Sequence, residues 1–312
     1  MVVPATVLLD GLEAECIGIP SELEQLSLDP RLDLDRLGLS PARKKESVPD
    51  PGRPVERGLA ETSQPHRDLP FRARQYPGSV DPVVGVGSRV LKLYRSAVRK
   101  PTPFREAAIH ATVETMGLPV PAVWGVQEVG GRWGIVFDRI SEASFAKRMQ
   151  EDPSLVPECL EILVRLHARI HTHPAHELGS LKLRLAANIA RTGLLDEPRK
   201  QILLSLLAEM PKGDRLCHGD FHPINVLGQT SQPLVIDWPD ACRGDPSADV
   251  CRSYLLLKLH AAEIAEPYLD AYCRITNISR ATIVGWLPYV AVARLAEDVP
   301  NDFERLLEIV NS

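Results

Sequence analysis

The residues best suited to chemistry lie in a polar cluster between apolar runs, the ten residues Cys217–Val226 (CHGDFHPINV). Asp220 lies five residues before Asn225, and a second carboxylate, Asp237, ends a short apolar run. Phosphoryl transfer from a nucleoside triphosphate needs a carboxylate that positions the attacking hydroxyl and oxygen ligands for Mg²⁺. Each residue alone would more often be a turn former or a cap. Their order, H-G-D-x-x-x-x-N followed by a strand and I-D, favours a phosphotransferase site.

Length and composition are those of an ordinary globular protein. The 312 residues, 44% hydrophobic and 25% charged, suffice for one large domain or two lobes. The net charge of -5 gives no electrostatic footprint for nucleic acid or an anionic membrane. We find no signal-peptide pattern, no apolar run of roughly 18 residues and no C-x-x-C pair among the six cysteines. We therefore expect a cytoplasmic protein with reduced thiols and no nucleic-acid or membrane partner; the oligomeric state is unknown.

The first seventy residues differ in composition from the rest. Residues 1–39 are expected to be an N-terminal extension, in which the leucines between 23 and 39 could form a short amphipathic segment. Residues 40–70 are rich in Pro, Arg, Glu and Asp and lack an apolar period, which indicates a disordered or extended linker.

Residues 71–140 predict a small antiparallel sheet that carries one helix. The alternation around Lys92 in VLKLY is typical of a half-buried strand. A helix is expected over 103–116, ended by Gly117 with prolines beyond it. Residues 120–126 and 132–137 are expected to pair as a hairpin that turns at Gly130 and Gly131.

Residues 141–312 predict a larger, mainly helical part. The apolar spacing indicates helices over 155–171, 181–192, 198–210, 247–264, 266–275, 279–296 and near 302–310. The polar cluster falls between these helices, as loops and short strands near the junction with the sheet. The expected fold class is therefore α+β, with two lobes.

Further motifs make this chain resemble the aminoglycoside phosphotransferase family, which is similar in fold to choline kinases and eukaryotic protein kinases. The resemblance covers roughly residues 72–300. It rests on the catalytic-loop motif and on VLKLY around Lys92, FREAA around Glu106, GLPVP at 117–121, LHARIH at 166–171 and GDPSAD at 244–249. It implies a bilobal protein-kinase-like fold and an enzyme that transfers a phosphoryl group to the hydroxyl of a small molecule.

The resemblance also implies a role for each matched residue. Asp220 would be the catalytic carboxylate, and Asn225 and Asp237 would hold Mg²⁺. Lys92 would contact the phosphates of ATP or GTP, with Glu106 orienting its flexible stem. Glu114 is a weaker rival of Glu106 for that pairing.

Three residues are expected to support the loop from behind. His218 is expected to pack and hydrogen-bond within it, and not to act as a base. Asp249 is expected to accept backbone N–H groups of the loop. Asp245 could do similar work or cap the helix that follows.

A phosphate-covering glycine turn is poorly defined in this sequence. Gly78 and Ser79 are the only pair far enough before Lys92 to form it, and they are our candidates for nucleotide binding. The run 85–88 (GVGS) lies too close to Lys92 and is interpreted as the turn into that strand.

Other readings remain open. A catalytically weak nucleotide-binding regulatory module would share the same fold. A metallohydrolase could use the histidines near Asp220 in the sequence. His167 could suggest the same chemistry, but it lies on an apolar stripe and is better explained as a core residue. No activation segment follows Asp237, which disfavours a protein substrate. The acceptor itself is not defined: acidic residues at 263, 266, 270 and 298 could attract a cationic aminoglycoside or form a solvated face.

Overall fold

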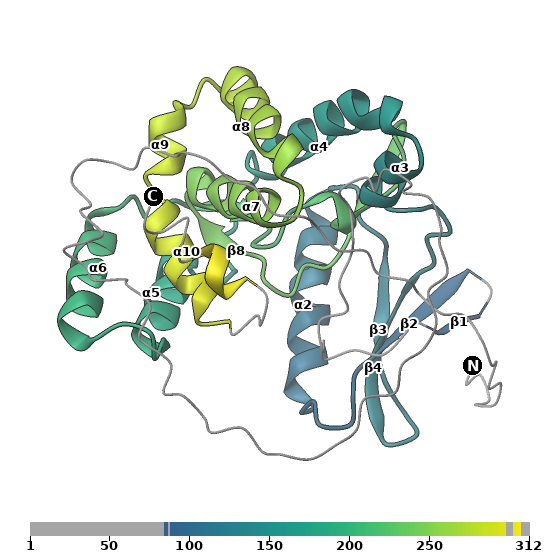
Figure 1. Cartoon of the computed structure of the whole chain (residues 1–312). Helices are drawn as coiled ribbons and strands as arrows, with labels where there is room; N and C mark the ends of the chain where they lie inside the picture. Colours follow the sequence, from purple (N-terminus) through teal and green to yellow (C-terminus); the bar gives the residue numbers. More distant parts are fainter. Residues whose placement is uncertain (1–83, 87, 298–301, 307–312) are drawn as a thin grey trace, which may run out of the picture.

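The structure is a computed structural model that describes residues 84–86, 88–297 and 302–306. A small sheet with one helix stands beside a larger helical part (Figure 1). This is the expected α+β, two-lobed architecture. The expected extension 1–39, the linker 40–70 and the pair Gly78-Ser79 lie outside the described residues.

The small lobe is an antiparallel sheet in the order β1-β2-β4-β3. Its elements are β1 (Val84–Val86), β2 (Arg89–Leu93), α2 (Pro101–Thr115), β3 (Val123–Val129) and β4 (Arg132–Asp138). Of the GVGS run expected to form the turn, Gly85 and Val86 lie in β1 instead, and Ser88 lies in a turn just before β2. Gly130 and Gly131 turn the β3–β4 hairpin with φ of 57° and 74°, values that glycine adopts without steric cost.

The large lobe is built around a buried helix. Its helices are α3 (Phe145–Glu151), α4 (Val156–Ile170), α5 (Leu181–Arg191), α6 (Glu197–Glu209), α7 (Pro246–His260), α8 (Ala262–Thr276), α9 (Arg280–Val284) and α10 (Leu287–Leu295), with single 3₁₀ turns η1 (Pro153–Leu155) and η2 (Pro223–Asn225). Thirteen residues of α7 are buried, and α8, α9 and α10 pack against it. A helix enclosed on all sides needs no polar face. The start of α7 is thus a rigid support for the loops beside it.

Four short strands frame the predicted polar cluster. β5 (Arg215–Cys217) pairs with β8 (Cys242–Gly244), and β6 (Val226–Gln229) pairs with β7 (Gln232–Val235). The cluster follows β5, and Asp237 follows β7. No helix of the described residues is long and apolar enough to cross a membrane.

Two expected long helices are interrupted. The helix expected over 279–296 is divided into α9 and α10, because Pro288 lacks the N–H that would continue the hydrogen-bond ladder across Gly285 and Trp286. The helix expected over 247–264 ends at His260, and α8 begins after Ala261, whose φ of -159° is not helical. Pro267 lies inside α8, so the expected start at residue 266 was also wrong.

Helix α3 was not expected, although its sequence contains a start signal. The Ser144 side chain accepts a hydrogen bond from the N–H of Lys147 at 3.2 Å, as an N-cap does. Phe145 and Met149, four residues apart, bury one face of the helix.

Candidate active site

The predicted polar cluster forms a loop that is held at both ends. The paired strands β5 and β8 fix its start, and β6 and β7 fix its end. The N–H of Ile236 donates to the carbonyl of Asn225 at 2.9 Å, which ties this loop to the segment after β7. The two halves of the sequence motif, separated by β6 and β7, are therefore brought side by side.

Asp220 lies in this loop between two cationic or potentially cationic side chains. Its Oδ1 is 3.3 Å from Nη2 of Arg252, and its Oδ2 is 3.3 Å from Nε2 of His222. The side chain is 29% exposed, so a ligand can reach it. Burial opposes ionisation, but His222 and Arg252 outweigh it and hold the pKa of Asp220 well below its usual range. The carboxyl group is therefore an ionised hydrogen-bond acceptor at neutral pH.

Asn225 closes the loop with its own side chain. Its Nδ2 donates to the backbone carbonyl of Asp220 at 2.9 Å, which fixes the direction of the amide. Among the described residues, none donates a hydrogen bond to its Oδ1. The residue is 5% exposed, so a buried loop presents one oxygen ligand without a protein partner.

Asp237 adopts a left-handed backbone conformation, with φ of 64°. Aspartate tolerates this region better than most residues, and the conformation turns the chain sharply after β7. Its Oδ1 is 2.7 Å from Nζ of Lys92, and its side chain is 39% exposed. Asp237 thus joins the large lobe to the sheet.

Lys92 lies between two carboxylates. Its Nζ is 2.7 Å from Oε1 of Glu106 on α2 and 2.7 Å from Oδ1 of Asp237. Burial by itself would lower the pKa of Lys92, but Asp237 and Glu106 outweigh it and raise the pKa above its usual value. The lysine is charged, and β2 and α2 aim it at the loop of the other lobe.

The sequence-based reasoning missed Tyr94, which supports the same glutamate. The Tyr94 hydroxyl donates to Oε2 of Glu106, so both carboxylate oxygens are engaged. Tyr94 lies two residues after Lys92, and alternate residues of a strand point to the same face. That spacing was the available signal. The rival Glu114 accepts from the N–H of Val123 at 3.0 Å instead, which joins α2 to β3.

His218 is a neutral, buried ring behind the loop. The N–H of Asp220 donates to its Nδ1 at 3.2 Å, so that nitrogen carries no proton, and its Nε2 lies 3.0 Å from the carbonyl of Ile236, to which it donates. Burial lowers the pKa of His218, which agrees with the neutral form. The ring packs against Trp238. His218 therefore shapes the loop and has no free nitrogen for proton transfer.

Asp249, on the first turns of α7, accepts from four donors. Its oxygens receive the backbone N–H groups of His218 (2.7 Å) and Gly219 (2.8 Å), and Oδ2 lies 3.0 and 3.1 Å from Nε2 of His167 and His171. Burial would raise its pKa, but the two histidine contacts hold the pKa of Asp249 well below the usual range. One buried carboxylate thus anchors the loop that carries Asp220 to the helical core. Of the two roles expected for Asp245, support of the loop or capping of the next helix, the structure shows the second. Its side chain caps α7 by accepting from the N–H of Ser247 at 2.7 Å.

His167, His171 and Asp249 also form a group with the side chains of a metal site. Nδ1 of His167 lies 2.5 Å from the hydroxyl of Tyr268, and Nδ1 of His171 lies 2.7 Å from that of Tyr272. Every ring nitrogen therefore has a protein partner. Burial lowers the pKa of His167 to about 3, so the ring is neutral. These contacts support the core interpretation of His167 and give no independent support to a metallohydrolase.

Gly219 gives the loop its path. Its φ is 84°, and a Cβ at this position would collide with the carbonyl oxygen of Asp240. The Arg184 guanidinium donates to that same carbonyl and lies 3.2 Å from Oδ1 of Asp240. The neighbouring segments approach so closely that only glycine fits.

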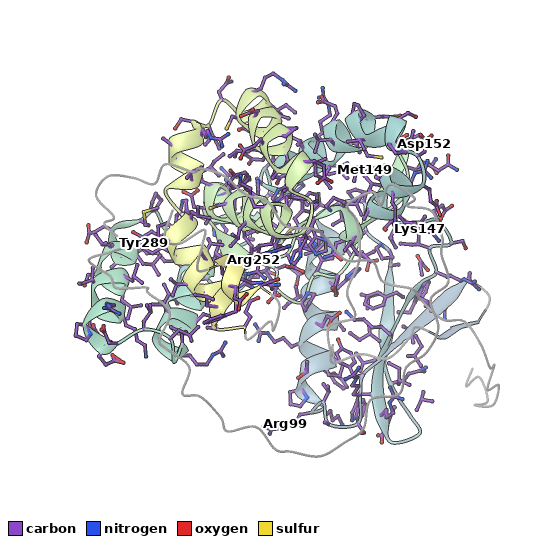
Figure 2. All side chains as sticks on the ribbon, in the orientation of Figure 1. Arg99, Lys147, Met149, Asp152, Arg252 and Tyr289 are labelled. Carbon is purple, nitrogen blue, oxygen red and sulfur yellow. The ribbon has the colours of Figure 1, made fainter. Side chains whose placement is uncertain are left out.

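Arg252 is the most prominent site residue that the sequence-based reasoning did not identify. It lies on α7, near the centre of the molecule (Figure 2), and contacts both Asp220 and Glu297. Its distance of 32 positions from Asp220 follows no local rule, so no sequence signal could have paired them.

Comparisons with known proteins identify the family of this chain. The model of the phosphotransferase enzyme family matches residues 80–283, well over half of the chain. No curated protein matches significantly.

Solved structures of aminoglycoside phosphotransferases are similar in fold. The apo form of a thermostable mutant of APH(4)-Ia has a TM-score of 0.54 at 17% identity, over 73% of this chain and 86% of that one. A thermostable mutant of the same enzyme, in a ternary complex with ADP and hygromycin B, has a TM-score of 0.53 at 16% identity, over 72% and 83%. These identities show the fold alone, whereas the family match shows that the chain belongs to the phosphotransferase enzyme family.

Proposed function

We propose that this protein transfers the γ-phosphoryl group of a nucleoside triphosphate, ATP or GTP, to a hydroxyl of a small molecule in a Mg²⁺-dependent reaction. One observation supports the proposal most. Nζ of Lys92 lies 2.7 Å from both Glu106 and Asp237, so a cation of the sheet lobe meets the carboxylate beside the catalytic loop. A polyphosphate that binds between the lobes would find this cation next to one of the proposed metal ligands.

The residues present suit Mg²⁺. This ion prefers oxygen ligands and takes one or two carboxylates together with substrate phosphates. Asp237 supplies a partly exposed carboxylate, and Asn225 supplies an amide oxygen that none of the described residues occupies. When bound, the ion would neutralise charge on the donor phosphates. Asp237 and Asn225 are the residues that would hold it.

The chain's own residues divide the remaining work. Lys92 would contact the donor phosphates while Glu106 and Tyr94 hold its direction. The ionised Asp220 would accept a hydrogen bond from the acceptor hydroxyl and orient it for attack. Its low pKa makes it a weak base, which fits a loose transition state in which positioning matters more than early proton removal.

The adenine or guanine would lie where β4 leaves the sheet. The N–H groups of Asp138 and Arg139 donate to the carbonyls of Ala122 and Ser88, at 3.0 and 2.8 Å. The backbone of Ile140 makes no backbone hydrogen bond to the other described residues. Its backbone is therefore the best candidate among residues 137–140 for a contact with the base.

Two of the four acidic residues considered for a cationic acceptor are engaged elsewhere. Glu266 lies 2.9 Å from Nζ of Lys258 and pairs with Arg280, whose Nη1 is 3.2 Å from Asp270. Burial would raise the pKa of Glu266, but Tyr254 and these cations lower it to about 2. Structural ion pairing accounts for these two carboxylates, and residue 298 lies outside the described residues. We therefore propose a hydroxyl-bearing small molecule and no narrower class.

A nucleotide-consumption screen tests the function directly. The full chain would be incubated with Mg²⁺ and ATP or GTP over a panel of aminoglycosides, amino alcohols, choline-like alcohols and sugars. Acceptor-dependent turnover that disappears in Asp220→Asn would support the proposal. Full turnover by Asp220→Asn on the true acceptor would refute the assignment of Asp220. Binding of Mg²⁺-nucleotide without transfer to any acceptor would favour a regulatory module.

A further inference from the structure

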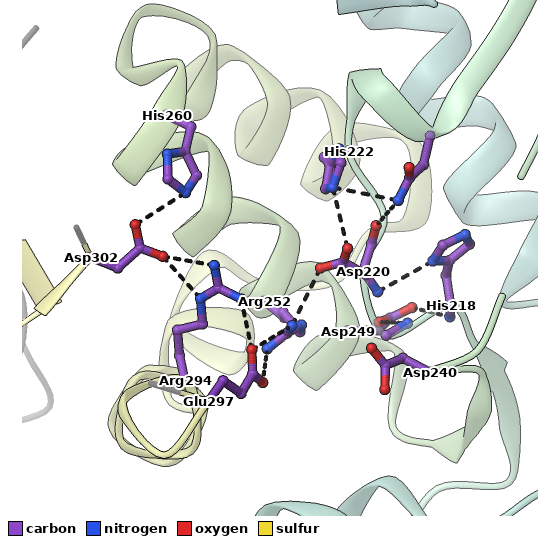
Figure 3. A network of polar contacts seen from close by, with 12 residues as sticks. His218, Asp220, His222, Asp240, Asp249, Arg252, His260, Arg294, Glu297 and Asp302 are labelled. Carbon is purple, nitrogen blue, oxygen red and sulfur yellow. Dashed lines mark hydrogen bonds and ion pairs between the residues drawn. The ribbon is translucent and has the colours of Figure 1, made fainter. Parts of the chain in front are cut away.

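A chain of alternating charges runs from Asp220 into the C-terminal part of the large lobe (Figure 3). Nη1 of Arg252 is 2.9 Å from Oε1 of Glu297, and its Nη2 is 3.2 Å from Oε2. Nη1 of Arg294 is 2.7 Å from Oε2 of the same glutamate, and its Nη2 is 2.7 Å from Oδ2 of Asp302. Each carboxylate after Asp220 therefore contacts two cationic or titratable side chains, since Asp302 also lies 3.4 Å from Nε2 of His260.

This chain of charges is largely buried. Arg252, Arg294 and Asp302 are 9%, 8% and 1% exposed. Bidentate pairing with Glu297 fixes the plane of the Arg252 guanidinium more firmly than its longer, single contact with Asp220. The orientation of Arg252 is thus set from the side away from the catalytic loop.

The segment 302–306 is attached to the same network. Asp302 and Leu306 are each 1% exposed, and Arg305 donates to the carbonyl of Leu259 at 2.7 Å. This segment follows α10 and packs at the end of α7, the helix that carries Arg252. Contacts far from the catalytic loop in sequence therefore bear on the residue that touches Asp220.

We propose that Arg252 is a positioning residue for Asp220, and that Glu297, held by Arg294 and Asp302, sets the position of Arg252. The C-terminal segment would thereby control the carboxylate that receives the acceptor hydroxyl. This inference rests on the proposed function for its catalytic consequence, while the positioning itself can be tested without an acceptor.

The direction of each perturbation follows from the charges. The groups that face Asp220 are His222 and His218 from its own loop and Arg252 from α7. Without Arg252, the carboxylate loses a fixed partner. Without the charge of Glu297, Arg252 is free to move onto Asp220 and to occupy the oxygen that the acceptor hydroxyl needs. Both changes would slow transfer, and the second would act only through Arg252.

The test that needs no acceptor is carbon-detected NMR of the full chain with ¹³C-labelled aspartate. The Asp220 carboxyl signal is assigned by its loss in Asp220→Asn. We expect Glu297→Gln to move this signal at pH 7, and to leave it unmoved when Arg252→Met is already present. We also expect Arg252→Met to move the Asp220 signal at pH 7, because the carboxylate loses the guanidinium that contacts it. Arg252→Lys keeps the charge and is a control for misfolding of Arg252→Met. Its Asp220 signal should lie closer to the wild-type position than that of Arg252→Met.

A matched control is available on the same lobe. Arg280 also contacts two carboxylates, Glu266 and Asp270, but does not contact the catalytic loop. Arg280→Met should leave the Asp220 signal in place. An unmoved Asp220 signal in both Arg252 variants would overturn the positioning role, and an equal response to Glu297→Gln with and without Arg252 would overturn the control by Glu297.

Kinetics then connect positioning to transfer. With an acceptor from the screen, Arg252→Met and Glu297→Gln should each lower kcat, by up to about 100-fold, with little change in the KM for nucleotide. The double variant should be no slower than Arg252→Met alone. Multiplying losses would refute action through Arg252. If no acceptor is found, the proposed function fails while the NMR result still decides the positioning role.

Discussion

The clearest prediction concerns Asp249, the buried carboxylate that joins the loop of Asp220 to the core. Asp249→Asn keeps the shape of the side chain but removes its charge and replaces one oxygen with an NH₂ group. The carboxylate now accepts from the N–H groups of His218 and Gly219 and from the rings of His167 and His171. In either orientation of the amide, at least one donor would face another donor.

The magnitude follows from these contacts. A buried polar group left unsatisfied costs about 1–3 kcal/mol, and breaking a buried, hydrogen-bonded ionic cluster costs about 3–5 kcal/mol. Asp249 is 1% exposed, so water cannot replace the lost partner without rearrangement. We expect the free energy of unfolding to fall by about 3–5 kcal/mol, a large part of the 5–15 kcal/mol that is typical of a folded protein.

Urea unfolding followed by circular dichroism would measure the loss. Asp245→Asn is the matched control, since it makes the same chemical change four residues earlier, at the N-cap of the same helix, where asparagine caps as well as aspartate. Native-state hydrogen exchange gives a local readout, because the amides of His218 and Gly219 should exchange faster. A loss below about 1 kcal/mol with both amides still protected would refute this account of Asp249.

Four further predictions follow from the same geometry. Gly219→Ala should destabilise the protein by about 2 kcal/mol or more in thermal unfolding, because of the positive φ and the collision, whereas Gly193→Ala, with open space around its Cβ, should not. Burial lowers the pKa of His167 from about 6.5 in the unfolded chain to about 3, so the unfolded state alone binds this proton between those values; the free energy of unfolding should fall as the pH falls from about 6.5 to about 3, less steeply in His167→Gln. Glu106→Gln should weaken Mg²⁺-nucleotide binding about tenfold in calorimetry, because the lysine loses its orienting charge, and unchanged affinity would contradict this role. Asp237→Asn should also weaken that binding at least about tenfold while it keeps the left-handed backbone, so equal affinity for Mg²⁺-nucleotide would exclude a metal-binding role.

The elements of the small lobe were predictable because local patterns dominate there. Alternation marked β2 around Lys92, and paired glycines marked the turn between β3 and β4. The helical lobe was harder, because its interior helices are apolar on most faces and lose their periodic signal. The sequence-based boundaries therefore ran across Ala261 and across the break before Pro288.

The residues of the site also fall into those that the sequence could relate to one another and those that it could not. Asp220 and Asn225 share one loop, where spacing alone relates them, and Asp237 follows after one short hairpin. Tyr94 could have been predicted from the alternation of side chains along a strand, but it was overlooked. Arg252 and Glu297 could not be predicted from the sequence, because Arg252 contacts Asp220, and Glu297 contacts Arg252, only once distant segments pack together.

The chemical groups of this site and their order can be read from the sequence, because a loop motif keeps its residues at a fixed separation along the chain. Which charges meet depends on how distant segments fold onto one another. Lys92 lies 145 positions from Asp237, and no local pattern spans that separation. The buried environment then selected the charge states, because desolvation leaves His167 and His218 neutral while opposite charges keep Lys92 and Asp220 ionised.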